Sequence, residues 1–163
     1  MTAEERFIQR DRMRYIKNSL AANLALLGIL FNVFFFVSIC KSDVGNYYYT
    51  YMIGVSIIYN LAFMLATFLS SEGVKNYQKG YSYLLLLLGI IQFVRIFIFP
   101  TDAHSAMVSL NGVETQVMSD GQFFRVVLYL AVSGACLLCS AAVNLVRCRA
   151  LAEHMKALET QNV

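Results

Sequence analysis

The chain has 163 residues, of which 58% are hydrophobic and only 14% are charged, and its formal net charge is +3. Its mean hydropathy of +0.58 is typical of membrane proteins and argues against an ordinary soluble domain of this length. The basic residues lie beside the ends of apolar blocks rather than together on one face. The positive charge therefore does not indicate nucleic-acid binding.

Four long apolar blocks contain most of the hydrophobic residues. Each block has close to the length that a helix needs to cross the hydrocarbon, which is about 20 residues. In the hydrocarbon, every peptide group must find its hydrogen-bond partner inside the helix. The sequence predicts an all-α integral membrane protein, with four transmembrane helices in two antiparallel hairpins that form one bundle over residues 19–146. The predicted helices are residues 20–40, 47–70, 81–99 and 123–146.

The first block follows a basic arm, as the hydrophobic region of a signal peptide would. It runs for about 21 residues, however, whereas a signal h-region has roughly 7 to 15. No small-residue cleavage site follows it cleanly. A retained first helix is the favoured interpretation, and a cleaved signal is the alternative.

The arm of residues 1–18 mixes apolar side chains with five basic residues and contains no Gly or Pro. This composition predicts an amphipathic helix on the membrane surface. There its arginines would meet anionic lipid, at about 1 kcal/mol per basic residue. The alternative is that these arginines only fix the topology, and the sequence leaves both interpretations open.

Basic residues also follow the second helix and occur in the tail of residues 147–163, whereas the loop of residues 100–122 has no Lys or Arg. By the positive-inside rule, both termini are predicted to be cytoplasmic, and residues 100–122 form an outer loop. The expected location is the cell membrane.

The outer loop contains the one segment with a strand-like pattern. Asn111 and Gly112 stand between two alternating runs, and Asn-Gly favours the type I′ turn of a two-residue hairpin. We expect a β-hairpin over residues 107–116 in which Leu110 lies opposite Val113. A loose loop is the alternative.

Arg95 is the sharpest candidate for a functional residue. It lies about one turn before Pro100, where the third helix is expected to end because proline cannot continue a helix without losing a hydrogen bond. Arg125 is expected at the same level of the fourth helix. Either both arginines reach the interface and pair with loop carboxylates, or they form a site for an anion or lipid headgroup. The loop carboxylates are Asp102, Glu114 and Asp120.

Neutral amides recur in all four predicted helices. Hydrogen bonds between such groups across helix interfaces average about 0.6 kcal/mol, so these amides are expected to tune helix register. The alternative is a polar pathway, which requires the amides to converge on one cavity. The residues of this candidate pathway or interface are Asn23, Asn32, Asn60, Gln92, Arg95, Arg125 and Asn144.

The fourth helix carries two rows of small residues, which predict close packing against another helix of this chain or of a partner. The first row is Ser133, Cys136 and Ser140, continuing to Asn144, and the second is Ala131, Ala135 and Cys139. The Cys136–Cys139 spacing resembles half of a redox or metal site. It lacks a second ligand pair, so these thiols are expected to be packing groups.

Catalytic motifs are lacking in the sequence. His104 and His154 are predicted on opposite sides of the membrane, and no Asp or Glu lies within a predicted helix core. No nucleotide-binding loop, zinc helix or nucleophile elbow occurs. We therefore expect no catalytic residue, no cofactor and no metal, and an intramembrane enzyme ranks well below the other interpretations.

The expected function is that of a non-catalytic accessory or structural subunit of a larger membrane assembly. The alternative is a small homo-oligomeric channel that favours anions, with amide faces around a pore and the arginines at its outer mouth. The expected partners are the lipid bilayer, other membrane-protein chains in a hetero-complex or homo-oligomer, and anionic lipid at the N-terminal arm. No nucleic acid is expected.

Overall fold

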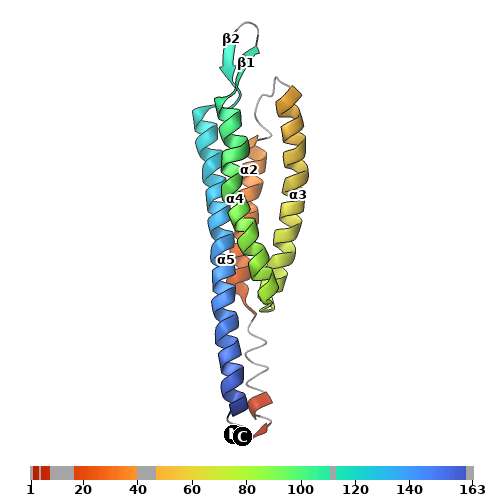
Figure 1. Ribbon diagram of the computed structural model, residues 1–163, viewed down its shortest axis with the longest axis vertical. Helices are drawn as coiled ribbons and strands as arrows, with labels where there is room; N and C mark the ends of the chain where they lie inside the picture. Colours follow the sequence, from red (N-terminus) through yellow and green to blue (C-terminus); the bar gives the residue numbers. More distant parts are fainter. Residues whose placement is uncertain (1, 4, 8–16, 40–46, 111–112, 161–163) are drawn as a thin grey trace.

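The computed structural model describes residues 2–3, 5–7, 17–39, 47–110 and 113–160. Its elements in chain order are α2 (Ser19–Ile39), α3 (Tyr47–Lys75), α4 (Lys79–Ser105), β1 (Met107–Leu110), β2 (Val113–Gln116) and α5 (Asp120–Thr160). The helices lie along one long axis (Figure 1). The start of α2 and the end of α5 lie at one end of this axis, which we call the terminal end. The two strands lie at the opposite end, which we call the hairpin end.

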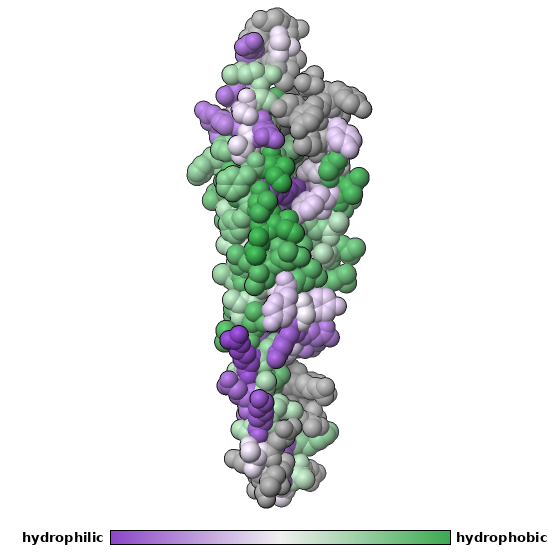
Figure 2. All heavy atoms as spheres, viewed as in Figure 1, coloured by the Kyte–Doolittle hydropathy of each residue, from purple (hydrophilic) through white to green (hydrophobic). Residues whose placement is uncertain are grey.

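Helices α2, α3, α4 and α5 are each long and apolar enough to cross a membrane, which confirms the four helices predicted from the sequence. They leave large apolar side chains uncovered, among them Ile58, Leu65 and Phe97. Figure 2 shows these surfaces as a broad hydrophobic band, with hydrophilic residues gathered toward both ends. Such an apolar girdle suits contact with lipid.

Helix α4 does not end at Phe99, as the sequence predicted, but continues through Pro100 to Ser105. Proline has no N–H with which to bond the carbonyl one turn earlier. Here the Thr101 hydroxyl donates a hydrogen bond to that carbonyl, the backbone oxygen of Ile96, at 2.9 Å. The carbonyl keeps a partner, and the helix passes the proline.

Two other helices are also longer than predicted. Helix α3 continues past Ser70 to Lys75, because the Ser70 hydroxyl bonds a carbonyl of its own helix rather than ending it. A turn with Tyr77 at a φ of 58° then leads to α4. Helix α5 continues to Thr160, through most of the predicted tail. The predicted amphipathic arm lies mostly outside the described residues.

The helices meet closely at glycines. A Cβ added to Gly134 of α5 would lie 2.8 Å from the Phe93 ring and 3.2 Å from the Gly89 carbonyl of α4. One added to Gly28 of α2 would lie 2.8 Å from Leu137. The absence of side chains at these points lets α5 pack against both neighbours.

Two clusters of buried apolar residues form the core. The first is Ala21, Ala25, Phe63, Val74, Leu85, Leu88, Leu137 and Ala141. The second, nearer the hairpin end, is Phe35, Ile39, Ala103, Val117, Met118, Val126 and Leu130.

Strands β1 and β2 pair in antiparallel fashion. The register is Met107 with Gln116, Val108 with Thr115, Ser109 with Glu114, and Leu110 with Val113. The turn predicted at Asn111 and Gly112 lies outside the described residues. At the base of the strands, Val117 donates a backbone hydrogen bond to Ala106 at 3.1 Å. Val117 and Met118 are buried against the helices, so the strands are tied to the bundle.

Candidate functional site

Polar side chains from all four long helices meet in one layer inside the bundle. We call this group the Arg95 layer, and its members are Asn32, Ser56, Asn60, Gln92, Arg95 and Ser133. The amides and Ser133 are almost completely buried, and Arg95 is only 8% exposed. Arg95 lies ten residues, or about 15 Å of helix, from the end of α4, within the candidate membrane span Lys79–Ser105.

The amides of this layer bond to one another. Asn32 of α2 donates from Nδ2 to Oδ1 of Asn60 in α3 at 3.0 Å. Gln92 of α4 donates from Nε2 to Oδ1 of Asn32 at 3.0 Å and to Oγ of Ser133 in α5 at 3.2 Å. The Ser133 hydroxyl in turn donates to the Gly28 carbonyl at 2.8 Å. One network therefore joins all four helices.

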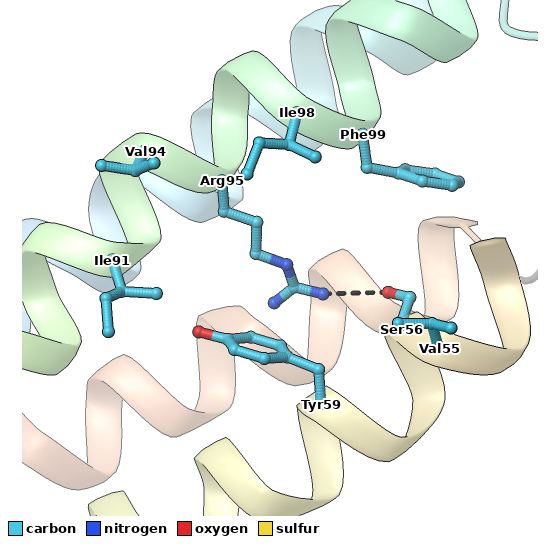
Figure 3. Close-up of a pocket in the computed structure, with 8 residues that line it drawn as sticks. All are labelled: Val55, Ser56, Tyr59, Ile91, Val94, Arg95, Ile98 and Phe99. Atoms are coloured by element: carbon cyan, nitrogen blue, oxygen red, sulfur yellow. Dashed lines mark hydrogen bonds between the residues drawn. The ribbon is translucent and has the colours of Figure 1, made fainter.

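The guanidinium of Arg95 enters this network from α4. Its Nη1 donates to Oδ1 of Asn60 at 3.1 Å and to Oδ1 of Asn32 at 3.4 Å. Its Nη2 donates to Oγ of Ser56 at 3.0 Å (Figure 3). All three acceptors are neutral oxygens, so they orient the positive charge without cancelling it.

Two aromatic rings also hold the guanidinium. Its central carbon lies 4.3 Å from the ring centroid of Phe35 and 4.5 Å from that of Tyr59. The faces of aromatic rings carry partial negative charge and attract cations. Arg95 thus turns into the bundle and does not extend to the interface.

The predicted pairing of the arginines with loop carboxylates is wrong for the described part of the chain. The ion pairs among the described residues join Lys75 to Glu72 and His104 to Asp120. Arg125 is exposed, and its Nε donates to the Gly121 carbonyl at 3.1 Å. The pairing fails because Arg95 lies a further turn and a half of helix from the loop, since α4 does not end at Pro100.

A cavity of about 240 Å³ lies beside Arg95, between α3 and α4. Its lining residues are Val55, Ser56, Tyr59, Ile91, Val94, Arg95, Ile98 and Phe99. Figure 3 shows the guanidinium and Tyr59 projecting into the space between the two helices. The side chains of Val55, Val94 and Ile98 are about half exposed. The cavity therefore opens on the side of the bundle, between apolar side chains of α3 and α4.

Hydrogen-bonding capacity remains unused at this site. Within the described chain, the buried Tyr59 hydroxyl and the buried Oε1 of Gln92 have no hydrogen-bond partner. A buried polar group without a partner costs about 1–3 kcal/mol. Arg95 has five N–H donors, and its recorded bonds use three of them. A cation and spare donors thus lie behind a cavity wall that is mostly apolar.

A second polar layer lies nearer the terminal end. We call it the Asn144 layer, and its members are Asn18, Ser82, Asn144 and Arg147. Asn144 accepts a hydrogen bond from Nδ2 of Asn18 at 2.8 Å and donates to Oγ of Ser82 at 2.6 Å. Arg147 donates to Oδ1 of Asn18 at 3.0 Å. The same Oδ1 lies 3.4 Å from the Ala21 amide, so Asn18 caps the start of α2.

The residues predicted from sequence thus separate into distinct groups. Asn32, Asn60, Gln92 and Arg95 come together, Asn144 lies in the other layer, and Asn23 and Arg125 are exposed. Ser133 and Ser140 are buried, and Cys136 is half-buried. In the second predicted row, Ala131 is half-buried, whereas Ala135 and Cys139 are exposed and do not pack inside the chain.

Sequence reasoning missed Ser56 and Tyr59. Ser56 lies four residues before Asn60, and that spacing places two polar side chains on one helix face. Tyr59 gave no such signal, because tyrosines within an apolar helix are ordinary core residues.

Within the described residues, no group of three His, Cys, Asp or Glu side chains is placed to share a metal ion. Comparison with protein-family models, with curated protein sequences and with solved structures finds no match to this chain. Function is therefore inferred from the geometry of the site.

Proposed function

We propose that this chain is a non-catalytic accessory subunit of a larger membrane assembly, and that it contributes an anion-binding site at membrane depth. The observation that carries the proposal is the environment of Arg95. Arg95 is 8% exposed, and its guanidinium lies beside a cavity and bonds only to neutral groups among the described residues.

The energetics support an anion at this position. Placing an arginine at the centre of a membrane helix costs about 2.5–3.5 kcal/mol on insertion scales. Three hydrogen bonds at about 0.6 kcal/mol each and two aromatic contacts at about 0.5–2 kcal/mol each offset most of that cost. The charge itself is not cancelled and attracts anions strongly, because the surroundings have a low dielectric constant.

The amide geometry favours a subunit over a homo-oligomeric channel. Asn32, Asn60 and Gln92 bond to one another inside a single chain, whereas a pore between copies needs them to face outward. Ten residues of α4 separate Ser82 from Gln92, so the two polar layers lie about 15 Å apart. Apolar residues such as Leu85 fill the interval.

Helix α3 offers the surface for a partner chain. Only 22% of its most apolar window is buried, compared with 33–39% for the other three helices. Gly54 faces open space, since a Cβ there would meet no atom within 4 Å. An exposed glycine lets the backbone of another helix approach closely. We place the partner on the stripe formed by Tyr51, Gly54, Ile58, Ala62, Leu65 and Leu69.

In this proposal, the protein lies in the cell membrane as two helical hairpins with both termini in the cytoplasm. The hairpin end and its β1–β2 hairpin are then on the outer side. The predicted amphipathic arm lies on the cytoplasmic surface, where its arginines meet anionic lipid.

Native mass spectrometry of the protein extracted gently from its own cells tests the subunit proposal. We expect a second polypeptide bound to the wild type and to Ala142→Leu, which adds three carbons, one fewer than Gly54→Leu, to an exposed position of α5. Gly54→Leu should lose the second polypeptide, because its side chain blocks close approach. A wild-type mass of 18.4 kDa or a multiple of it, without a second polypeptide, would contradict the subunit role, and a multiple would favour the channel.

A further inference from the structure

The cavity beside Arg95 has walls and a base of different chemistry. Ile91, Val94 and Phe99 give it apolar walls, whereas Arg95 and Tyr59 supply donors at its base (Figure 3). Its opening lies between the half-exposed apolar side chains of Val55, Val94 and Ile98. A ligand therefore enters sideways, from the membrane.

The unused donors suit an acidic headgroup. The recorded bonds of Arg95 leave its Nε–H and one N–H of Nη2 without an acceptor in the described chain. A guanidinium edge with two donors matches the paired oxygens of a carboxylate or phosphate. The Tyr59 hydroxyl, also without a partner there, is a third donor, buried behind the same wall.

The size of the cavity and its walls indicate an amphiphile rather than a small free anion. A hydrated anion would have to leave water and cross apolar surface, whereas an amphiphile already has its chain in the membrane. Pockets that enclose whole drug-sized ligands measure roughly 300–1,000 Å³. A cavity of about 240 Å³ can hold a headgroup and the first part of one chain, and the rest lies against exposed residues such as Val94 and Ile98.

We propose that the α3–α4 cavity binds the acidic headgroup of a membrane amphiphile, with Arg95 and Tyr59 as its donors and the acyl chain passing out between the helices. The inference rests on the proposed anion-binding site and names its ligand. The same chemistry has two sources, the carboxylate of a free fatty acid and the phosphate of an anionic phospholipid.

Purified protein in vesicles of neutral phosphatidylcholine tests this inference. The probes are a photoactivatable palmitate and the matched photoactivatable hexadecanol, which has the same chain without the charge. We expect the palmitate to label α3 and α4 about tenfold more than the alcohol, since the charge-assisted hydrogen bonds belong to the headgroup. Phosphatidylglycerol is then added in place of part of the phosphatidylcholine. Displacement of the palmitate assigns the site to a phospholipid, and its retention assigns it to a fatty acid.

Two pairs of variants show whether the label reports the cavity. Arg95→Gln should abolish the preference for palmitate, whereas Arg125→Gln, which removes an exposed charge at the hairpin end, should keep it. Val94→Trp fills the cavity and leaves Arg95 in place, so it should reduce labelling to the level of the alcohol. Leu87→Trp, two turns away on the same exposed face of α4, is its control.

Equal labelling by palmitate and hexadecanol, or an unchanged preference in both Arg95→Gln and Val94→Trp, would overturn the inference. The proposed function is tested by a separate result. If no acidic amphiphile binds but Arg95→Gln loses the second polypeptide in cell extracts, the anion at Arg95 belongs to a protein partner and the proposed function stands. If neither depends on Arg95, the anion site and its ligand are both wrong, and the subunit role is decided by the wild-type mass alone.

Discussion

The two polar layers of the bundle contain the same kinds of side chain but serve different purposes. In the Asn144 layer, amides, a hydroxyl and Arg147 bond to one another where the helices end, and the half-exposed arginine stays close to water. In the Arg95 layer, the arginine is buried at membrane depth, and Tyr59 and Gln92 keep buried oxygens without partners in the described chain. The Arg95 layer borders the cavity described above.

This difference separates groups that hold the fold from groups that are available to a ligand. A network whose donors and acceptors are matched contributes stability and specifies register. A network with unmatched donors beside an opening carries an energetic cost that a ligand can remove. The number of polar residues in a membrane bundle is therefore a poor guide to its function. The presence of buried donors and acceptors without partners is a better guide.

The largest effect on stability is expected in the Asn144 layer. Asn144→Leu removes its bonds to Asn18 and Ser82 and leaves both partners buried, which should lower the free energy of unfolding by about 2 kcal/mol or more. Reversible unfolding in mixed detergent micelles measures this loss. Labelling by palmitate in the folded fraction should be unchanged. Equal stability of the variant and the wild type would mean that this layer does not hold the bundle.

At Tyr59 we expect a smaller effect on stability, and we expect the free energy of unfolding to rise rather than fall. Tyr59→Phe keeps the ring under Arg95 but removes a hydroxyl without a partner in the described chain. In neutral lipid, the free energy of unfolding should rise by up to about 1 kcal/mol, because a buried unpaired group is gone. Binding of the palmitate should weaken about fivefold, because one donor is lost. Loss of stability in neutral lipid would show that the hydroxyl already has a partner.

The smallest effect is expected at Asn23, which belongs to neither layer. It is exposed, and Asn23→Leu should change the free energy of unfolding by less than about 0.5 kcal/mol, as is usual for surface positions. Palmitate labelling should also stay constant. A clear loss of the second polypeptide in cell extracts would instead reveal a partner contact on the exposed face of α2.

The four helices were predictable because length and hydropathy are local properties of the chain. The residues at which the helices begin and end were less predictable. Pro100 alone indicates an end of α4, and only the Thr101 hydroxyl, by bonding the Ile96 carbonyl, explains why the helix continues. The extension of α5 to Thr160 similarly depends on a polar helix that hydropathy does not mark.

The convergence of the Arg95 layer depends on how each helix is rotated about its axis. Part of this was readable from spacing. Asn23 and Asn32 are nine residues apart, or about two and a half turns, so they must lie on opposite faces of α2 and cannot share one site. Which face of α4 turns inward is set by the packing of Gly89 against Gly134, a contact between helices that sequence spacing does not reveal.

The most direct test of the account is a solid-state NMR measurement of dipolar coupling between arginine guanidinium nitrogens and the labelled carboxyl carbon of palmitate, or the phosphorus of phosphatidylglycerol, in phosphatidylcholine vesicles. We predict a coupling at hydrogen-bonding range in the wild type and in Arg125→Gln, and its disappearance in Arg95→Gln. The same coupling in all three proteins, or none in the wild type with either ligand, would contradict the claim that Arg95 holds an acidic headgroup within the bundle.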